Sequence, residues 1–278
     1  MRLGELLPLY LSLRPAELSP EEWTSMFYWL TEAFSDCSRL EYHVHSDRSL
    51  SEHEQAAYMQ AFKKLADGIP VQYVLGKAYF GDHWFRVSPA TLIPRPETEE
   101  LVDWVVSDAE GQERILDIGT GSGCIAISLA DRLPAAEVSG LDISEAALEV
   151  AKDNARSIGV SLRWMHLDIL EKVPHGQYEI MVSNPPYVTQ QEKEQMRPNV
   201  LDFEPHTALF VPDEDPLLFY KRIAVISAEL LAPFGWVYLE INEYLGNEVV
   251  SLMEKEGFSH VELRKDFLGK DRFVKCRP

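Results

Sequence analysis

The spacing of apolar residues along the chain changes from a helical to a strand-like rhythm. In the first 70 residues, apolar side chains recur every three or four positions, which predicts helices. One helix follows the capping pattern Ser19-Pro20-Glu21-Glu22, and another covers 51–66 before Gly68-Ile69-Pro70 ends it. Residues 1–70 are therefore expected to form a small helical bundle with an aromatic core.

A stretch of alternating residues, 78–93, follows this bundle. Gly81-Asp82 near its start is typical of a hairpin turn, so a β-hairpin is expected within a linker over 71–93. The prolines of Pro94-Arg95-Pro96 enforce an extended path. Acidic residues then open a helix through Val106, and a second domain is expected over 94–278.

From Arg114 onward, short apolar runs alternate with helical patterns, including helices near 216–232 and 246–256. Strands are predicted at 114–118, 137–142, 161–167, 178–183, 236–241, 259–265 and 271–277. This alternation predicts an α/β fold, a mostly parallel sheet with helices on both faces. Gly269-Lys270-Asp271 joins the last two strands directly, so the last strand is expected to be antiparallel.

Composition narrows the classes of partner. The chain has 278 residues, 46% hydrophobic and 26% charged, with a formal net charge of −19. A protein that grips long nucleic acid needs a basic surface, so a small-molecule or protein substrate fits better. Three scattered cysteines, no signal-peptide pattern and no apolar window of about 18 residues indicate a reducing, cytoplasmic location.

The most informative polar segment is Asn184-Pro185-Pro186-Tyr187, which follows the predicted buried strand 178–183. In an open α/β sheet, ligands bind at the carboxyl ends of strands. Asparagine offers one side-chain acceptor and two donors, and the prolines leave the Pro185 carbonyl free to face a ligand. The segment is therefore suited to binding a planar amino group. The alternative is that it forms only a turn at the end of the strand, since Asn-Pro alone is typical of turns.

A glycine-rich loop follows the first strand of the sheet and opens a helix. Its residues are Asp117, Ile118, Gly119, Thr120, Gly121, Ser122 and Gly123. The loop lacks the G-x-G-x-x-G pattern of dinucleotide sites and the Gly-Lys-Ser/Thr of a P-loop. Because Asp117 disfavours a pyrophosphate, a cationic or zwitterionic ligand such as S-adenosylmethionine fits this loop better.

Acidic residues end the next two strands. Asp142 lies 25 residues after Asp117 and is placed to accept both hydroxyls of a ribose. Asp168 could accept from an adenine amine, with Ile169 packing on the ring. Asp142 fits equally well as the cap of a helix that begins near Glu145. The four strand ends together predict one cofactor and substrate site.

These residues resemble a class I S-adenosylmethionine-dependent methyltransferase, and more narrowly the glutamine methyltransferases that modify peptide-chain release factors. The resemblance covers nearly the whole chain. The matching segments are Gly68 to Gly76, Leu92 to Glu99, Asp117 to Gly123, Asp142, Asn184 to Tyr187, Glu204-Pro205 and Ala208-Leu209. It implies a Rossmann-like seven-stranded domain, S-adenosylmethionine as cofactor, release factors as partners, and an N-terminal domain that helps choose the protein substrate.

The chemistry that the resemblance implies is methyl transfer to the side-chain nitrogen (N5) of the glutamine in a Gly-Gly-Gln motif. The Asn184 oxygen and the Pro185 carbonyl would accept its two N–H groups and orient the lone pair. Tyr187 would stack on the flat amide. No side-chain base is required before transfer, because the proton becomes acidic only as the new bond forms.

Other interpretations stay open from the sequence. A ribosomal protein glutamine is one alternative substrate, and adenine in nucleic acid is another, since adenine-specific DNA methyltransferases share Asn-Pro-Pro-Tyr. A non-catalytic module that keeps the fold is a third. The net charge of −19 weighs against nucleic acid, and the intact glycine loop weighs against the module.

Several single residues allow two interpretations. His43 and His45 have a spacing seen in metal sites, but a solvated linker is favoured and no metal is expected. Cys124 begins a helix, where a thiol can become reactive, but a small core residue is favoured. Arg95 and Glu97 either help to shape a lid over the cofactor or are ordinary helix-start residues. Glu204-Pro205 either acts as part of the family's later motif or only braces the loop after Tyr187.

Overall fold

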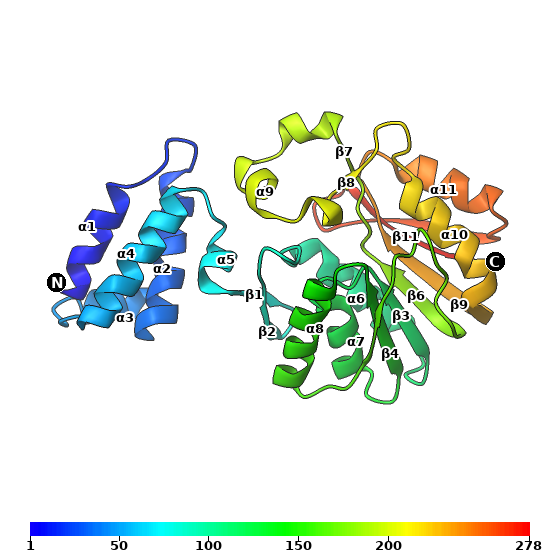
Figure 1. Cartoon of the computed structure of the whole chain (residues 1–278), viewed down its shortest axis with the longest axis horizontal. Helices are drawn as coiled ribbons and strands as arrows, with labels where there is room; N and C mark the ends of the chain where they lie inside the picture. The colour runs from blue at the N-terminus through cyan, green and yellow to red at the C-terminus, as the bar shows by residue number, and fades with distance from the viewer. The chain divides into compact units, whose positions relative to one another are not determined.

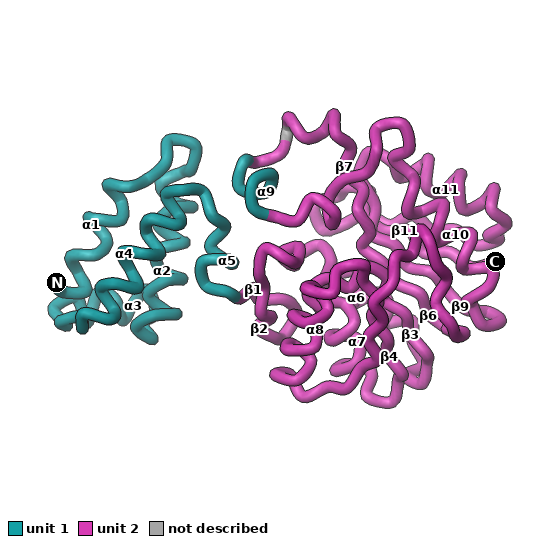
Figure 2. Tube along the Cα trace, in the orientation of Figure 1, with its two compact units in different colours: residues 1–76, 198–203 teal, residues 77–197, 204–278 magenta. Residues whose placement is uncertain are grey.

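The computed structural model describes residues 1–194 and 196–278. The chain forms two compact units, shown in Figure 2. One contains Met1–Gly76 and the short segment Pro198–Phe203, and the other contains Lys77–Arg197 and Glu204–Pro278. Each unit has its own hydrophobic core.

The first unit is the predicted helical bundle. Its elements are η1 (Leu3–Glu5), α1 (Leu6–Leu11), α2 (Pro20–Ser35), α3 (Arg39–Val44), α4 (Glu52–Ala66), α5 (Val71–Leu75) and α9 (Pro198–Phe203). Ser19 caps α2 by accepting from the Glu22 amide, as its sequence predicts. Tyr10 stacks on Trp23 with ring centroids 4.2 Å apart, inside a core built from the aromatic stripe.

The boundary of this unit differs from the one that the sequence suggested. The bundle was expected to end at residue 70, yet α5 belongs to it, because Val71 is buried in its core. The hairpin of β1 (Lys77–Phe80) and β2 (His83–Arg86) has Gly81 in a left-handed conformation at its turn. It packs in the second unit through Phe80 and Phe85, so it is not a free linker.

The second unit is built on a seven-stranded sheet. Its strands are β3 (Arg114–Ile118), β4 (Glu137–Asp142), β5 (Arg163–His166), β6 (Tyr178–Ser183), β9 (Leu231–Glu240), β10 (His260–Lys265) and β11 (Asp271–Arg277). The order is β10-β11-β9-β6-β3-β4-β5, and β11 runs antiparallel to both of its neighbours. This confirms the predicted mostly parallel sheet with its antiparallel last strand.

Helices cover both faces of this sheet (Figure 1). They are α6 (Pro96–Asp108), α7 (Cys124–Arg132), α8 (Glu145–Ile158), α10 (Leu218–Leu230) and α11 (Gly246–Lys255). Side chains of the central strands β3, β6 and β9 alternate between two cores, as a strand's two-residue period requires. Leu116 packs with α10 and α11, whereas its neighbour Ile115 packs with α6 and α7.

The segment after β6 departs from the regular alternation. It contains β7 (Val188–Thr189), η2 (Gln191–Gln195), α9, η3 (His206–Ala208) and β8 (Phe210–Val211). Strands β7 and β8 pair in parallel, so the two ends of the segment lie side by side although α9 belongs to the first unit. None of the helices in the described part of the chain has the length and apolar character of a membrane span.

Candidate functional site

A cavity of about 340 Å³ lies at the carboxyl edge of the parallel strands. It is lined by the residues that end β3, β4 and β6 and by those that follow β5, which is where ligands bind in open α/β sheets. Two loop segments complete its wall, 90–92 and 205–210. Its volume is that of a small-molecule site.

Most of the residues that the sequence singled out meet in this cavity. Those that line it are Gly119, Gly121, Asp142, Asp168, Ile169, Asn184, Pro185 and Pro186. At Gly119 and Gly121 the backbone is left-handed, and an added Cβ would enter open space. The loop therefore forms a cradle that a bound molecule can approach closely.

Asp117 lies behind the glycine loop instead of at its mouth. The side chain is fully buried, and its Oδ2 accepts from the Thr120 hydroxyl at 2.6 Å and from the Ala126 amide at 3.3 Å. Burial raises the pKa of Asp117 to about 7. Its Oδ1 is buried without a hydrogen-bond partner among the described residues, so one acceptor stays unsatisfied beneath the cradle.

Asp142 is a wall residue and not a helix cap. Its Oδ2 accepts from the Gly121 amide and its Oδ1 from the Ser144 amide, both at 2.8 Å. The cap of α8 is Ser144, whose hydroxyl accepts from the Ala147 amide. Burial raises the pKa of Asp142. The alternative of a capping role for Asp142 is thereby excluded, and its carboxylate ties the second strand end to the glycine loop.

The Asn184 turn is held from behind by α6 and β9. The Asn184 side-chain nitrogen donates to the Thr98 hydroxyl at 3.2 Å, and Thr98 in turn donates to Glu240 at 2.6 Å. The Tyr187 hydroxyl also donates to Glu240, at 3.3 Å, and burial raises the Tyr187 pKa. Pro185 and Pro186 line the cavity, whereas the hydroxyl of Tyr187 points away toward Glu240.

Comparison with known proteins decides the family. Residues 10–76 match the family model described as PrmC N-terminal domain, and residues 98–201 match the one described as Methyltransferase small domain. A "Release factor glutamine methyltransferase" of Flavobacterium psychrophilum is 43% identical over 261 residues, which cover 92% of each chain. The chain belongs to the release factor glutamine methyltransferase family. It is therefore a methyltransferase whose methyl donor is S-adenosylmethionine.

Other relatives agree with this assignment. The "Release factor glutamine methyltransferase" of Bacteroides thetaiotaomicron is also 43% identical, over 257 residues and 92% of each chain. Among solved structures, the hMettl16 catalytic domain in complex with MAT2A 3'UTR hairpin 1 has a TM-score of 0.56 at 16% identity, covering 90% of both chains. At that identity the likeness shows the fold alone, which is the class I methyltransferase fold that the sequence predicted.

In this glutamine methyltransferase, an ion pair between a partly exposed arginine and a buried carboxylate joins the two segments that complete the cavity wall. Arg95 Nη2 lies 2.7 Å from Glu204 Oε1, and the Ile93 amide donates to Glu204 Oε2 at 3.1 Å. The Glu204 side chain is only 1% exposed. Glu204 therefore does more than brace its own turn, because it fastens the 90–95 segment to the 204–210 segment.

Two residues of the site were missed from the sequence, Thr98 and Glu240. Thr98 lies inside 92–99, one of the segments that carry the family resemblance. A threonine in the first turn of a helix is ordinary, so the sequence did not mark it as a site residue. Glu240 ends a strand, as Asp142 does, and an acid at a strand end was the available signal.

Cys124 and His43, the other candidates from the sequence, do not line the cavity. Burial raises the pKa of the Cys124 thiol to about 12. The His43 ring forms a hydrogen bond with the Tyr28 hydroxyl in the helical unit.

Proposed function

We propose that this enzyme transfers the methyl group of S-adenosylmethionine to the side-chain nitrogen of the glutamine in the Gly-Gly-Gln motif of peptide chain release factors. The observation that carries the proposal is the Asn184 amide at the cavity wall. One N–H of its side chain donates to Thr98, which leaves the Asn184 oxygen, on the other side of the amide, as an acceptor for a ligand in the cavity that Asn184 lines. An acceptor of this kind, beside the Pro185 carbonyl, suits the two N–H groups of a carboxamide.

The residues around the cavity fit the cofactor. The Gly119–Gly121 cradle would receive its amino-acid portion, and Asp142 would accept from its ribose hydroxyls. Asp168 and Ile169 would hold the adenine. Asp117, Thr120, Ser122 and Gly123 would support the cradle from behind, where Asp117 Oδ1 and Ser122 Oγ are buried without a hydrogen-bond partner among the described residues. The bound cofactor supplies an electrophilic methyl group on a positively charged sulfur.

The residues of the turn would act on the substrate by placement. An amide nitrogen is a weak nucleophile because its lone pair is delocalised into the carbonyl. When the Asn184 oxygen and the Pro185 carbonyl accept its N–H groups, the lone pair is aimed at the methyl carbon. The N–C bond forms as the C–S bond breaks, and the nitrogen then releases a proton to water. Tyr187 would stack on the flat amide.

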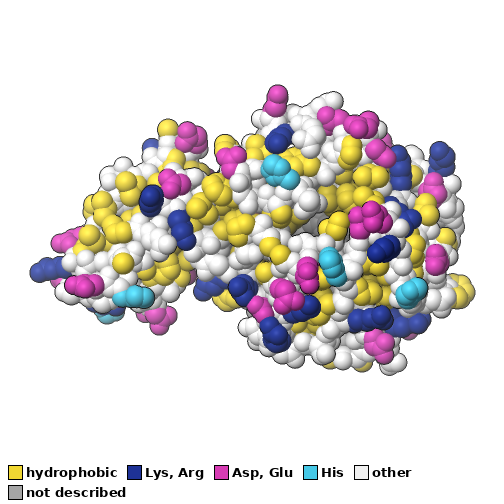
Figure 3. Space-filling model, viewed as in Figure 1, with side chains coloured by type: hydrophobic (Ala, Val, Ile, Leu, Met, Phe, Trp, Pro, Cys, Tyr) yellow, Lys and Arg dark blue, Asp and Glu magenta, His cyan; other side chains and the backbone are white. Residues whose placement is uncertain are grey.

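Charge supports a protein substrate over nucleic acid. The net charge is −19, and on the face drawn in Figure 3 acidic and basic side chains are interspersed. We infer that the helical unit helps to select the release factor. A cytoplasmic location goes with this function, since translation termination takes place there.

Mass spectrometry of a release factor tests the proposal. After incubation with S-adenosylmethionine that carries a deuterated methyl group, a mass gain is expected on the glutamine of the Gly-Gly-Gln motif. A release factor with that glutamine replaced by alanine is the matched control and should gain nothing. The proposal would be contradicted if a ribosomal protein or nucleic acid gained the deuterated methyl group while the release factor did not.

A further inference from the structure

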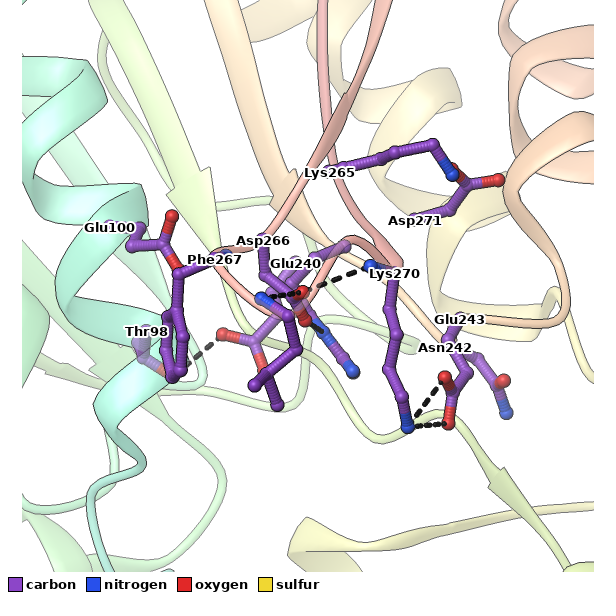
Figure 4. Close-up of polar contacts among 12 residues, drawn as sticks. Thr98, Glu100, Glu240, Asn242, Glu243, Lys265, Asp266, Phe267, Lys270 and Asp271 are labelled. Atoms are coloured by element: carbon purple, nitrogen blue, oxygen red, sulfur yellow. Dashed lines mark hydrogen bonds and ion pairs between the residues drawn. The ribbon is translucent and has the colours of Figure 1, made fainter.

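Behind the Asn184 turn lies a buried polar pair that the chemistry above does not use. Thr98, in the first turn of α6, and Glu240, the last residue of β9, are 2% and 1% exposed. The Thr98 hydroxyl donates to Glu240 Oε2 at 2.6 Å, as Figure 4 shows. The same Thr98 oxygen accepts from the Asn184 side-chain nitrogen at 3.2 Å. The three side chains thus form one chain of hydrogen bonds from β9 to the cavity.

The direction of these hydrogen bonds follows from the number of protons. A threonine hydroxyl has one proton and two lone pairs. When that proton is donated to the Glu240 carboxylate, Thr98 offers Asn184 only a lone pair. Only the NH₂ side of the Asn184 amide can bind a lone pair, so the opposite side, the oxygen, must face the other way. An amide rotated by half a turn would set two acceptors against each other.

The carboxylate that sets this direction also holds the second polar side chain of the turn. Glu240 Oε1 accepts from the Tyr187 hydroxyl at 3.3 Å. A buried carboxylate is costly unless its oxygens are hydrogen-bonded and a positive charge is near. Arg272, whose Nε is bonded to Asp266 at 3.0 Å, supplies that charge from β11. One buried group therefore contacts both ends of the Asn-Pro-Pro-Tyr segment, directly or through Thr98.

We propose that Thr98 and Glu240 are positioning residues that fix the Asn184 amide with its oxygen toward the cavity. Neither Thr98 nor Glu240 lines the cavity, so the pair acts on it through Asn184 and Tyr187. This inference rests on the proposed function for its effect on rate, because the orientation matters most if Asn184 must accept N–H groups. The orientation itself is a property of the protein that can be measured without any substrate.

The first test compares two replacements of Thr98. Thr98→Val keeps the shape but removes the hydroxyl, and Thr98→Ser keeps the hydroxyl. Thr98→Val is expected to lower kcat on the release factor roughly 10- to 100-fold, as for a misplaced reacting group, with KM and cofactor affinity nearly unchanged. Thr98→Ser should keep most of the kcat. Ser227→Ala, which removes a buried hydroxyl bonded to the Ile223 carbonyl in α10, is the matched control and should keep the parent kcat.

The second test observes the Asn184 amide directly in the protein without substrate. With ¹⁵N-labelled asparagine, and Asn184→Asp to assign the signal, the side-chain NH₂ should show one proton protected from exchange in the parent and in Thr98→Ser. In Thr98→Val and in Glu240→Gln, whose amide can offer Thr98 a donor or an acceptor, that protection should fall to the level of exposed asparagines.

The two readouts separate the two hypotheses. In one outcome the parent does not methylate release factors, yet its Asn184 NH₂ is protected and that protection is lost in Thr98→Val. The proposed substrate is then wrong, and the positioning role stands. If the release factor is methylated and both Thr98→Val and Glu240→Gln keep the parent kcat and the protected NH₂, the positioning role is overturned. Glu240→Gln also covers the case in which Thr98→Val does not fold.

Discussion

In the proposed function, Asn184 is a side chain whose surroundings fix it before the substrate binds. It follows β6 directly, and its nitrogen is bonded to Thr98, so its oxygen would meet a substrate without rearrangement. A preorganised acceptor costs little free energy at the moment of reaction, which is why such groups dominate catalysis by electrostatics. The loss of Asn184 should therefore affect the rate far more than cofactor binding.

We expect Asn184→Ala to lower kcat on the release factor by roughly 10²- to 10³-fold, the usual effect of removing one preorganised polar group. Calorimetry should show S-adenosylmethionine affinity within about threefold of the parent, because the ribose and adenine contacts are assigned to Asp142 and Asp168. A variant that methylates the release factor at the parent rate would show that the Asn184 amide does not hold the substrate.

Asp142 gives the opposite pattern. Its two oxygens are bonded to the Gly121 and Ser144 amides, and the carboxylate lines the cavity. Asp142→Ala should raise the Kd for S-adenosylmethionine by about 10- to 100-fold, the effect of losing hydrogen bonds to a charged group. Asp142→Asn, which keeps the shape and one acceptor, should lose less. Equal Kd values for parent and Asp142→Ala in calorimetry would refute the ribose assignment.

At the scale of elements, four strands were predicted to the residue, β3, β4, β6 and β11. Their apolar runs are bounded by polar or turn residues, so local pattern is sufficient. The start of β9 was predicted five residues late, at 236 instead of Leu231. Pro233 and Gly235 in that stretch do not look like a strand, and a register shift against β6 accommodates them.

The hydrogen bonds that complete the site could not be predicted from local pattern. Thr98 and Glu240 are 142 residues apart, and Arg95 and Glu204 are 109 apart. Each of the four has an ordinary local explanation as a helix-start, strand-end or turn residue. Only the closing of the sheet brings them together, whereas the glycine loop, Asp142 and Asn184 could be found because strand ends meet at one edge.

The Arg95–Glu204 pair is an element-scale feature, since it links two loops. Arg95→Ala should lower the free energy of unfolding by about 2 to 3 kcal/mol, because it leaves a buried carboxylate unpaired. Denaturant titration measures this, and calorimetry should show weaker binding of S-adenosylmethionine as the two walls loosen. Adding Glu204→Gln removes the unpaired charge, so the double variant should recover part of the lost stability. A double variant no more stable than Arg95→Ala would show that charge burial is not the cause.

At the scale of the whole molecule, the chain combines a helical unit with a catalytic unit that contains every residue lining the cavity. The division agrees with the segments that carry the family resemblance in the sequence, all of which lie from Gly68 onward. Binding and catalysis require a particular residue type at each strand end, whereas a helical core requires only apolar side chains of suitable size. The residues of the helical unit are thus freer to differ among relatives.

The stability of the whole molecule should respond to the titration of Asp117. Burial raises its pKa from 3.8 to about 7 in the folded state. The folded protein therefore holds this proton more tightly than the unfolded chain, so the contribution of Asp117 to stability is fully present only below about pH 3.8. It declines as pH rises from there and is lost once pH has passed about 7. Between pH 5.5 and pH 8, Asp117 alone should cost the parent about 2 kcal/mol of unfolding free energy.

Asp117→Asn isolates this effect, because asparagine cannot ionise and still offers an oxygen to the Thr120 hydroxyl and the Ala126 amide. The other buried acids with raised pKa, Asp142 and Glu240, are common to both proteins and largely cancel in the difference. Urea titrations of parent and variant across this pH range should show the variant gaining stability relative to the parent as pH rises. If the difference is independent of pH, Asp117 carries the same charge in the folded and unfolded chains, and its burial beneath the glycine loop is incomplete in solution.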